Sequence, residues 1–451
     1  MKHSLVVLAA GQGTRMHSDL PKVLHAIAGA PMLVHALRSG AALDPERTVI
    51  VTGHGAEQVA AAARSWDETV ETVVQADQLG TAHAVAQARE ALSGFDGDVT
   101  VLYGDTPFIR PATLERMAEA RSAGSDVVVL GFEAADPTGY GRLIVEDGEL
   151  TRIVEQKDAS TAEQAVTLCN SGVVSVSAEH LFSLVAEVRN DNAKGEYYLT
   201  DIVALARARG LSTAAVTCAE EETLGVNSRA DLARAEAIFQ AAARTELLES
   251  GVTLTAPETV FLSFDTVIGR DVTIAPNVVF GPGVTVETGA EIRAFCHLEG
   301  CHISEGAQIG PFARLRPGAE IGGSARIGNF VEVKNADVRE GAKVNHLTYV
   351  GDADVGREAN IGAGTITCNY DGVFKHRTVI GERAFIGSNS ALVAPLTIAD
   401  GGYVASGSVV TSDVGAGDLA IARARQENKP GLGARMLARL KALKAKQSGG
   451  K

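Results

Sequence analysis

The sequence has few cysteines and no paired cysteine motif. Its 451 residues include 5 cysteines, an odd number, and no two of them form a CxxC pair. This usage favours free thiols in a reducing compartment over a disulfide-bonded secreted protein. The apolar stretch at the start is too short for a signal peptide and runs directly into a motif. We therefore expect a cytoplasmic protein.

A long apolar run and an excess of positive charge are also absent. No stretch approaches the roughly 20 apolar residues that a membrane span needs. The 41 basic and 55 acidic residues give a formal net charge of −14. Because such a charge repels polyanions, we expect neither nucleic acid nor membrane as a main partner. Nucleotides remain compatible ligands, because local Lys and Arg side chains and Mg²⁺ can hold phosphates on an acidic protein.

What the second half does contain is an aliphatic residue at every sixth position. One such run is Ile303, Ile309, Leu315, Ile321, Ile327 and Val333, and others cover 268–292 and 380–410. This period fits neither a helix nor a simple strand and is typical of hexapeptide repeats in a parallel β-helix. Three sides make a coil of about 18 residues, with coils about 4.8 Å apart. The alternative, a β-sandwich, needs turn signals every 8–12 residues or so rather than a strict six.

The first half alternates strand-like and helix-like segments. Strands are expected at 4–10, 48–53, 69–75, 98–103 and 126–132, and helices at 32–42, 56–66, 81–92 and 111–123. This alternation predicts a Rossmann-like, mostly parallel sheet with helices on both faces, and an antiparallel hairpin is expected within 142–156. Ligands of such sheets bind beyond the carboxyl ends of the strands.

A long helix is expected between the two halves. Ser228 is a suitable N-cap and Gly251 a suitable C′ residue. We interpret this segment as a linker helix at 229–250 between a domain at 1–228 and a domain at 251–451, and a last packed helix of the first domain is the alternative. The chain then ends in a basic tail, which is typical of a solvated segment, with contact to a phosphate-bearing ligand as the alternative. Its basic residues are Arg435, Arg439, Lys441, Lys444, Lys446 and Lys451.

The loop after the first expected strand has the features of a phosphate site. Gly11 and Gly13 allow backbone N–H groups to approach phosphate closely, and Arg15 and Lys22 add positive charge. A lone glycine-rich loop is a weak signal, but its place after a strand and beside two cations strengthens the interpretation.

A second phosphate-related feature lies at the end of the strand expected at 98–103. Asp105 follows this strand, so its carboxylate lies at the sheet edge where Mg²⁺ on substrate phosphates would bind. An aspartate that only forms a turn is the alternative. Asn227 can supply a neutral oxygen to the same ion.

Six segments carry a family resemblance: LAAGQGTRM, DLPKVLH, QLGTAHA, LYGDTP, PTGYGR and NSGV. They resemble the sugar-nucleotidyltransferase (pyrophosphorylase) family. Joined to hexads, they resemble the family of bifunctional N-acetylglucosamine-1-phosphate uridylyltransferase/glucosamine-1-phosphate acetyltransferases, over nearly the whole chain. The implied fold class is α/β plus all-β, with a left-handed parallel β-helix after the linker helix. One departure is Gln12, where relatives commonly have Lys.

The resemblance assigns substrates to residues of the first half. For the uracil nucleotide it implies Leu8, Ala9, Ala10 and Gly11, with Gln75, Gly80 and Thr81 reading the base. Arg15 and Lys22 are expected at the phosphates of UTP. For the sugar it implies Tyr103, Gly141, Glu155 and Asn170, and for Mg²⁺ it implies Asp105 and Asn227. Gly104 is expected among the nucleotide and sugar-phosphate contacts of the same site.

Acyl transfer is indicated in the second half, where the hexads lapse between Ile361 and Ile380. An amine that attacks a thioester must lose a proton, and a histidine is the natural general base. His346, in the segment NHLTYVGD, is the candidate catalytic residue, and a structural histidine is the alternative. Glu332 is a candidate to orient its imidazole.

The resemblance also assigns ligands in the second half. It implies sugar-phosphate contacts by Arg316, Lys334, Tyr349, Asn360 and Lys375, for which scattered surface charge is the alternative. It implies acetyl-CoA contacts by Ala363, Asn369, Tyr370, Ser388, Ser406 and Arg423, although Ser406 stands where relatives often have alanine. A homotrimer is implied by analogy, because sites of this family lie between neighbouring prisms.

The resemblance thus implies two reactions. The second half would acetylate glucosamine 1-phosphate from acetyl-CoA, and the first half would join the product to UMP from UTP. Three alternatives stay open: a single-activity nucleotidyltransferase with a structural or regulatory β-helix, a non-catalytic scaffold, and a β-helix carbonic anhydrase with histidine-bound zinc. The intact phosphate residues count against the scaffold, and the lack of further histidines in polar motifs counts against the anhydrase.

Overall fold

The structure is a computed structural model that describes residues 2–146 and 148–448. The chain forms two compact units, Met1–Glu246 with Phe261–Asp265, and Leu247–Val260 with Thr266–Lys451. Within the described ranges, no helix has both the length and the apolar character required to cross a membrane.

The first unit contains a nine-stranded mixed sheet with the strand order β11-β7-β10-β6-β1-β4-β5, to which the hairpin β8–β9 is attached. Strand β10 runs antiparallel to both of its neighbours in this order, β6 and β7. The strands are β1 (His3–Ala9), β4 (Arg47–Thr52), β5 (Glu71–Val74), β6 (Asp98–Tyr103), β7 (Val127–Glu133), β8 (Arg142–Glu146), β9 (Glu149–Val154), β10 (Leu168–Ser177) and β11 (Thr213–Cys218).

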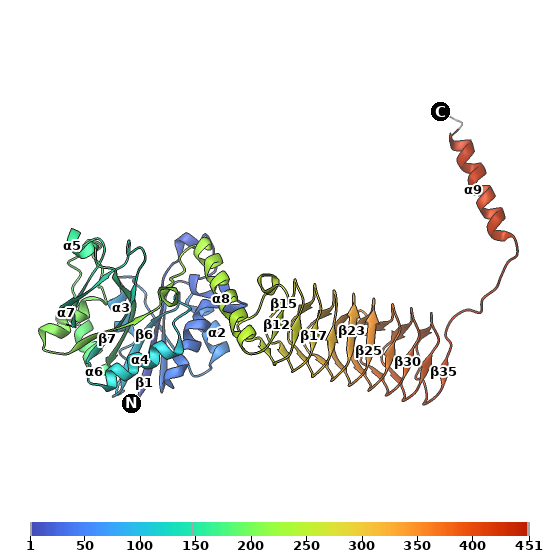
Figure 1. The fold of residues 1–451 in the computed structure, drawn as a ribbon, viewed down its shortest axis with the longest axis horizontal. Helices are drawn as coiled ribbons and strands as arrows, with labels where there is room; N and C mark the ends of the chain where they lie inside the picture. The colour runs from blue at the N-terminus through green and yellow to red at the C-terminus, as the bar shows by residue number, and fades with distance from the viewer. Residues whose placement is uncertain (1, 147, 449–451) are drawn as a thin grey trace. The chain divides into compact units, whose positions relative to one another are not determined.

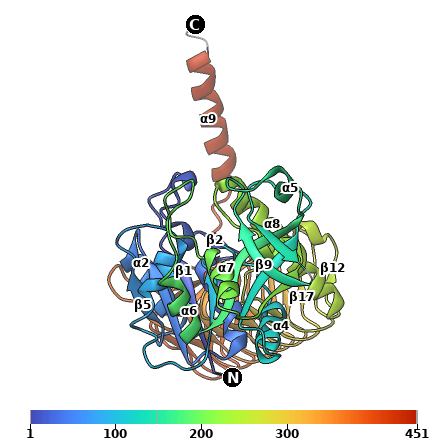
Figure 2. The same ribbon diagram turned by 90° about the vertical axis from the view of Figure 1, so that its left-hand side faces the viewer.

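Helices cover both faces of this sheet (Figures 1 and 2). The strands are apolar on both sides: along β1, Leu5 and Val7 pack on one face, and Val6 and Leu8 on the other. One face is covered by α1 (Met32–Gly40), α2 (Ala56–Trp66) and α4 (Pro111–Ser122), and the other by α3 (Thr81–Gln87), α6 (Ala178–Val185) and α7 (Asp201–Ala208). The predicted α/β architecture is therefore confirmed.

One helix of this unit is shorter than predicted, and the predicted hairpin is present. The helix expected at 81–92 ends early as α3, because the N–H of Ala88 bonds to the carbonyls of Val85 and Ala86 in a tightened last turn. The hairpin expected within 142–156 is present as β8 and β9. Its turn residue Asp147 lies outside the described residues.

The predicted long helix is α8 (Arg229–Glu249). The Ser228 hydroxyl caps it by accepting a hydrogen bond from the N–H of Asp231 at 3.2 Å. At its other end Gly251 has a φ of 91°, which glycine adopts without strain. The Glu236 carboxylate accepts a hydrogen bond from the N–H of Ala28 at 2.7 Å, so α8 is tied to the first unit.

The second unit is built from short parallel strands, mostly of two to four residues, stacked in ladders. One ladder contains β12 (Thr253–Leu254), β14 (Thr273–Ile274), β17 (Glu291–Ile292), β20 (Gln308–Ile309), β23 (Arg326–Asn329), β25 (Lys343–His346), β27 (Asn360–Ile361), β30 (Phe385–Ile386), β33 (Tyr403–Val404) and β35 (Leu419–Ala420).

The remaining strands of this unit form a branched ladder. Its main path is β13 (Val267–Ile268), β16 (Thr285–Val286), β19 (Cys301–Ile303), β22 (Ala319–Ile321), β24 (Glu332–Val338), β26 (Tyr349–Val355), β28 (Ile366–Cys368), β31 (Ala391–Val393) and β34 (Val409–Val410). Two branches consist of β15 (Val279–Phe280), β18 (His297–Leu298) and β21 (Arg314–Leu315), and of β29 (Thr378–Ile380) and β32 (Leu396–Ile398).

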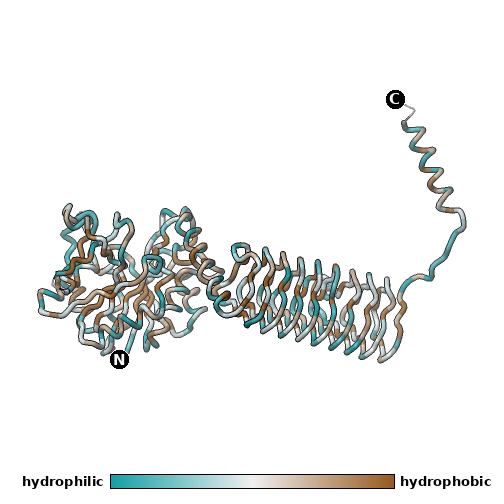
Figure 3. Tube along the Cα trace, viewed as in Figure 1, coloured by the Kyte–Doolittle hydropathy of each residue, from teal (hydrophilic) through white to brown (hydrophobic). Residues whose placement is uncertain are grey.

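The aliphatic residues of the six-residue period form the core of this β-helix. Ile292 pairs with Ile309, Ile309 with Ile327, and Ile327 with Val344, and each is at most 1% exposed. Apolar residues recur from coil to coil along the trace in Figure 3. The parallel β-helix predicted from the period is therefore confirmed.

One coil is longer than the others. Paired residues in the first ladder are 17 or 18 positions apart between β14 and β33, except that Asn360 pairs with Phe385, 25 positions later. The additional residues lie in a mostly exposed loop around Tyr370 and Lys375. The lapse in the hexads therefore marks a loop extruded from the coil, as predicted.

The basic tail contains a helix that the sequence interpretation did not include. Helix α9 (Leu432–Ser448) follows β35 after a run of mostly exposed residues. Its side chains are exposed at every position from Leu432 to Gln447. Lys451 lies outside the described residues.

Candidate active sites

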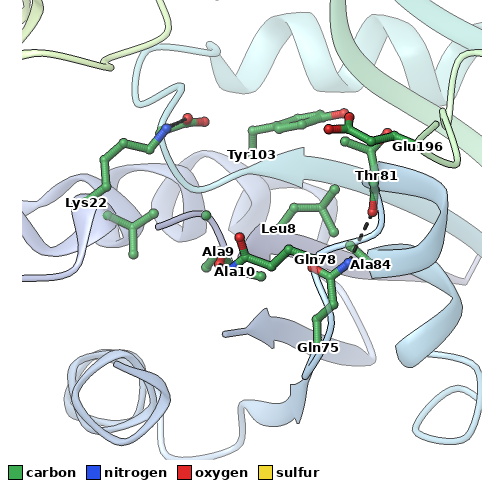
Figure 4. A pocket seen from close by; sticks show the side chains of 14 residues that line it. Leu8, Ala9, Ala10, Lys22, Gln75, Gln78, Thr81, Ala84, Tyr103 and Glu196 are labelled. Carbon is green, nitrogen blue, oxygen red and sulfur yellow. Dashed lines mark hydrogen bonds and ion pairs between the residues drawn. The ribbon is translucent and has the colours of Figure 1, made fainter. Parts of the chain in front are cut away.

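The first unit has a cavity of about 260 Å³ where β1 and β6 end (Figure 4). These parallel neighbours pair Leu8 with Tyr103, and β4 lies on the other side of β1, so the chain order reverses here. Such a switch point is where open α/β sheets bind ligands. Ten of the predicted residues line the cavity: Leu8, Ala9, Ala10, Gly11, Lys22, Gln75, Gly80, Thr81, Tyr103 and Asp105.

One part of the cavity is fixed by buried amide contacts. Gln75 is 4% exposed, and its Nε2 lies 3.1 Å from the carbonyl oxygen of Gly80 and 3.0 Å from Nδ1 of His83. Gly80 has a φ of 117°, and a Cβ there would lie 2.5 Å from the carbonyl oxygen of Tyr197. Only glycine fits this approach, so the strand end and the start of α3 are held in one geometry.

The phosphate end of the cavity brings together three residues that are distant in the sequence. The Lys22 ammonium donates to the Asp105 carboxylate and, at 3.1 Å, to Oδ1 of Asn227. The N–H of Val226 bonds to the carbonyl of Asp105 at 2.9 Å, which places Asn227 beside it. Gly13 is required here, because its φ is 63° and a Cβ would lie 2.6 Å from Cβ of Lys22. Two oxygens thus face one cationic group.

The residues predicted for the sugar also lie together. The N–H of Asn170 donates to the carbonyl of Gly141 at 2.8 Å, and a Cβ on Gly141 would lie 3.4 Å from Oε1 of Glu155. Burial raises the pKa of Tyr103 well above its usual range, and the charges of Asp105 and Glu155 add to this effect. Burial also raises the pKa of Glu155, which the charge of Lys194 opposes. Burial disfavours the charged form of Glu155, and a ligand that donates hydrogen bonds to this carboxylate would offset that cost.

Some predicted residues lie elsewhere, and other lining residues were missed. Arg15 is exposed and does not line the cavity, and its charge acts on Asp231. Gln78, which the sequence interpretation did not single out, donates from Nε2 to the carbonyl of Ala10 at 2.6 Å. Its signal was its place at the start of the segment QLGTAHA. Glu196 also lines the cavity and has no sequence signal that we can identify.

In the second unit, His346 contacts an amide rather than a carboxylate. Its Nδ1 lies 2.9 Å from Oδ1 of Asn329, which precedes it by one coil in the same ladder. The suggestion that Glu332 orients His346 is wrong in this structure, because Oε1 of Glu332 accepts from Arg316 at 2.9 Å instead. The physical reason is the register, which aligns position 329 and not position 332 with the histidine.

His346 begins a column that includes three predicted acetyl-CoA residues. Val344 pairs with Ile361, Ile361 with Ile386, and Ile386 with Val404. The residues two positions beyond each of these are His346, Ala363, Ser388 and Ser406. With about 4.8 Å between coils, the column extends about 14 Å along the prism. An elongated ligand can therefore contact all of its members.

A cluster of opposite charges lies on the other ladder. Asp352 is 6% exposed and accepts hydrogen bonds from Asn335, at 2.6 Å, and from Asn369. Burial alone would raise the pKa of Asp352, but these bonds and the charges of Lys334 and Lys375 lower it. The neighbouring Lys375 in turn lowers the pKa of Lys334, followed by burial, against the charge of Asp352. Two adjacent ammonium groups make a site for an anion.

The other predicted residues of this unit have varied positions. The Asn369 amide lies 3.5 Å from the Tyr349 hydroxyl, so Tyr349 adjoins the cluster. Asn360 is half-buried on β27, in the first ladder, which also contains β25 and His346. Tyr370 is exposed on the extruded loop and donates to the carbonyl of Gly372 at 2.6 Å, and Arg423 is exposed beyond β35.

Comparison with known families defines the class of the protein. Residues 5–166 match the MobA-like NTP transferase domain, and residues 265–300 match the bacterial transferase hexapeptide model with six repeats. The first match covers the cavity loop and β6, and the second covers coils of the β-helix. The chain is therefore a nucleotidyltransferase joined to a hexapeptide-repeat transferase, and the predicted left-handed parallel β-helix is confirmed.

Proteins named bifunctional protein GlmU match the whole chain. The protein from Ruegeria sp. strain TM1040 is 66% identical over 450 residues, covering 100% of both chains, and that from Cereibacter sphaeroides is 66% identical over 434 residues, covering 96% of this chain and 95% of the relative. The relative from Rhodospirillum rubrum is 59% identical and covers 99% of both. The chain belongs to the GlmU family. It is a bifunctional enzyme, as the sequence motifs predicted, and its family argues against the three alternatives.

The raised pKa of Glu155 predicts a pH-dependent effect of Glu155→Gln. Below its ordinary pKa the carboxyl is protonated in both the folded and the unfolded chain. The pKa of Glu155 is higher in the folded chain than in the unfolded chain. Its contribution to the free energy of unfolding is therefore fully present at low pH and is lost as the pH rises through the folded pKa. We expect Glu155→Gln to raise the denaturant midpoint of the first unit more at about pH 7 than at about pH 4. The control Glu133→Gln, at an exposed position of β7, should give the same small change at both pH values. An equal effect of Glu155→Gln at both values would contradict the desolvation argument.

Proposed function

We propose that the two units catalyse consecutive steps of UDP-N-acetylglucosamine synthesis. The second unit transfers acetyl from acetyl-CoA to the amine of glucosamine 1-phosphate. The first unit then transfers UMP from UTP to N-acetylglucosamine 1-phosphate and releases pyrophosphate. The observation that carries this proposal is the convergence of Lys22, Asp105 and Asn227 at a cavity of nucleotide-binding type.

Uridylyl transfer needs no covalent intermediate with the protein. A phosphate oxygen of the sugar phosphate attacks the α-phosphate of UTP in line, and the bond to pyrophosphate breaks. The Gly11 loop presents backbone N–H groups, and Lys22 presents a cation, to oxygens on which charge develops. Gln75 and Gly80 form a rigid edge for the base, and Glu155 and Asn170 accept or donate hydrogen bonds at the sugar.

The residues at the phosphate end fit a divalent cation. Oδ2 of Asp105 and Oδ1 of Asn227 already face one positive group, the Lys22 ammonium, and oxygen is the ligand that Mg²⁺ prefers. We assign these two oxygens to Mg²⁺, which when bound neutralises charge on the triphosphate. Lys22 is then available to contact a phosphate oxygen directly.

Acetyl transfer uses His346 as the general base. Oδ1 of Asn329 can only accept a hydrogen bond, so Nδ1 of His346 carries the proton and Nε2 has a free lone pair. Nε2 takes a proton from the amine of the sugar as the nitrogen attacks the thioester carbonyl, and the thiol of CoA leaves. Lys334 and Lys375 hold the phosphate of the sugar, and the column from Ala363 to Ser406 holds acetyl-CoA.

An exposed apolar ladder supports a homotrimer. Phe295, Phe312 and Phe330 stack with ring centroids 4.8 Å and 5.2 Å apart, and Leu347 follows in the next coil. These side chains are 45–62% exposed. Exposed apolar surface is unfavourable in water, and a second copy that covers these side chains removes it from water. Phe330 follows Asn329 and Leu347 follows His346 in the sequence, so a partner on this ladder closes one side of the acetyl-CoA column. A cytoplasmic location is part of the proposal and agrees with five free cysteines.

Single substitutions should separate the two reactions. Asp105→Ala removes a phosphate-end oxygen, and we expect uridylyl transfer to fall at least about 100-fold while acetyl transfer stays within about twofold. His346→Ala should give the reverse pattern, since it removes the base of acetyl transfer only. Both rates are measured on each variant, by pyrophosphate release and by CoA thiol release. Equal loss of both activities in either variant would contradict the assignment.

Disruption of the aromatic ladder should affect assembly and acetyl transfer together. Phe330→Lys places a charge on a surface that is exposed in the single chain, so each chain should fold while the trimer dissociates. Sedimentation velocity should show monomers, with acetyl transfer reduced at least about tenfold and uridylyl transfer retained. Phe385→Lys, in a separate aromatic column with Tyr403, is the matched control and should remain trimeric. A fully active Phe330→Lys monomer would refute the trimer.

A further inference from the structure

Helix α9 has an apolar stripe that no part of the proposed function uses. Leu432, Met436, Leu440 and Leu443 are spaced by four, four and three positions, which places them on one side of the helix. These four side chains are 37–60% exposed, and Leu437, at the border of the stripe, is 55% exposed. Apolar and polar positions alternate along this helix in Figure 3.

Basic residues border the stripe on both sides. At 100° per residue, Arg435, Arg439 and Lys446 lie along one edge, and Lys441 and Lys444 lie beyond the other edge. The pole opposite the stripe carries alanines. Long basic side chains can therefore extend their charges outward while their methylene groups follow the apolar surface.

The charge of this segment is opposite to that of the rest of the chain. Seven of the 41 basic residues and none of the 55 acidic residues follow Glu427. The expectation of no membrane partner rested on the formal net charge of −14 for the whole chain. The net charge of the whole chain does not show that this segment is strongly positive. Electrostatic binding to a surface depends on the local charge.

We infer that α9 binds the surface of bilayers that contain anionic phospholipids. The stripe enters the boundary between headgroups and acyl chains, and the bordering cations contact the lipid phosphates. With 17 residues and five charged side chains, α9 lies on a bilayer and does not span it. The proposal is independent of the two catalytic reactions.

Two other partners fit the helix less well. In a coiled coil of identical α9 helices with Leu440 and Leu443 in the seam, Arg439 and Lys446 occupy g positions and Lys444 an e position, so parallel copies repel each other. The second alternative is the exposed column of Phe385, Tyr403 and Leu419 on the β-helix. These three side chains supply apolar surface, and Asp418, next to Leu419, supplies one carboxylate against the five cations. A bilayer with anionic lipids offers an apolar region for the stripe and phosphate groups for the basic side chains.

Vesicle sedimentation with the full chain tests this inference. The probes are vesicles of phosphatidylcholine alone and vesicles with about a quarter of phosphatidylglycerol. Each basic residue near an anionic surface strengthens binding by about fivefold, so we expect at least about tenfold tighter binding to the anionic vesicles. Raising the salt concentration to about 0.5 M should remove most of this difference.

Variants separate the contributions of the stripe and of the charges. Leu440→Gln with Leu443→Gln should weaken binding to anionic vesicles at least about tenfold, because two large apolar side chains are lost from the interface. Arg435→Gln with Arg439→Gln should weaken it by a similar factor and reduce the salt dependence. Ala438→Gln with Ala445→Gln, on the opposite pole, is the matched control and should bind as the parent chain does. All variants should retain uridylyl transfer.

Three results would overturn the inference. The first is equal binding of the parent chain to both kinds of vesicle, or no binding to either. The second is an equal loss of binding in the control variant and in the Leu440→Gln, Leu443→Gln variant. The third is a parent chain that does not bind vesicles, together with a leucine variant that has a lower unfolding temperature or a lower sedimenting mass. That result would mean that α9 docks on the β-helix or on another copy.

Discussion

Each coil of the second unit must bring an aliphatic residue to the same inward position as the coil before it, and the rest of the unit depends on this constraint. Ile309, Ile327 and Val344 stack in register and are buried almost completely. The stack also fixes the residues that follow, because each lies two positions beyond a buried residue that pairs with its counterpart in the next coil. A column such as His346, Ala363 and Ser388 is therefore as regular as the core behind it. The prism functions as a rigid support for side chains about 4.8 Å apart.

The first unit uses register in a related way. Parallel pairing of β1 with β6 places the ends of both strands at one edge, so the Gly11 loop and Asp105 meet although they are far apart in the sequence. Asn227 reaches the same point through one backbone hydrogen bond from Val226 to Asp105. In the first unit the phosphate-end residues lie beyond the strand ends, and in the second unit the proposed chemistry lies on strand residues and on those that follow them, at positions that pairing makes precise.

The sequence predicts much of this arrangement, and its failures have physical causes. The six-residue period predicts the β-helix, and the segments around Gly11, Lys22 and Asp105 predict the phosphate end. The choice of Glu332 as the partner of His346 failed because the coil repeat aligns Asn329 with His346 and Glu332 with Tyr349, on a different strand. Glu196 reaches its cavity through tertiary packing, which no local pattern encodes. Helix α9 is not evident from the basic charge of the tail, and only the spacing of its leucines indicates an amphipathic helix.

The central claim is that one chain performs both reactions in sequence. The most direct measurement supplies the purified protein with glucosamine 1-phosphate, acetyl-CoA, UTP and Mg²⁺, and follows UDP-N-acetylglucosamine by chromatography, with each ingredient omitted in turn. The account predicts product only in the complete mixture, and N-acetylglucosamine 1-phosphate alone when UTP is omitted. Formation of UDP-N-acetylglucosamine without acetyl-CoA, or no acetylated sugar in the absence of UTP, would contradict it.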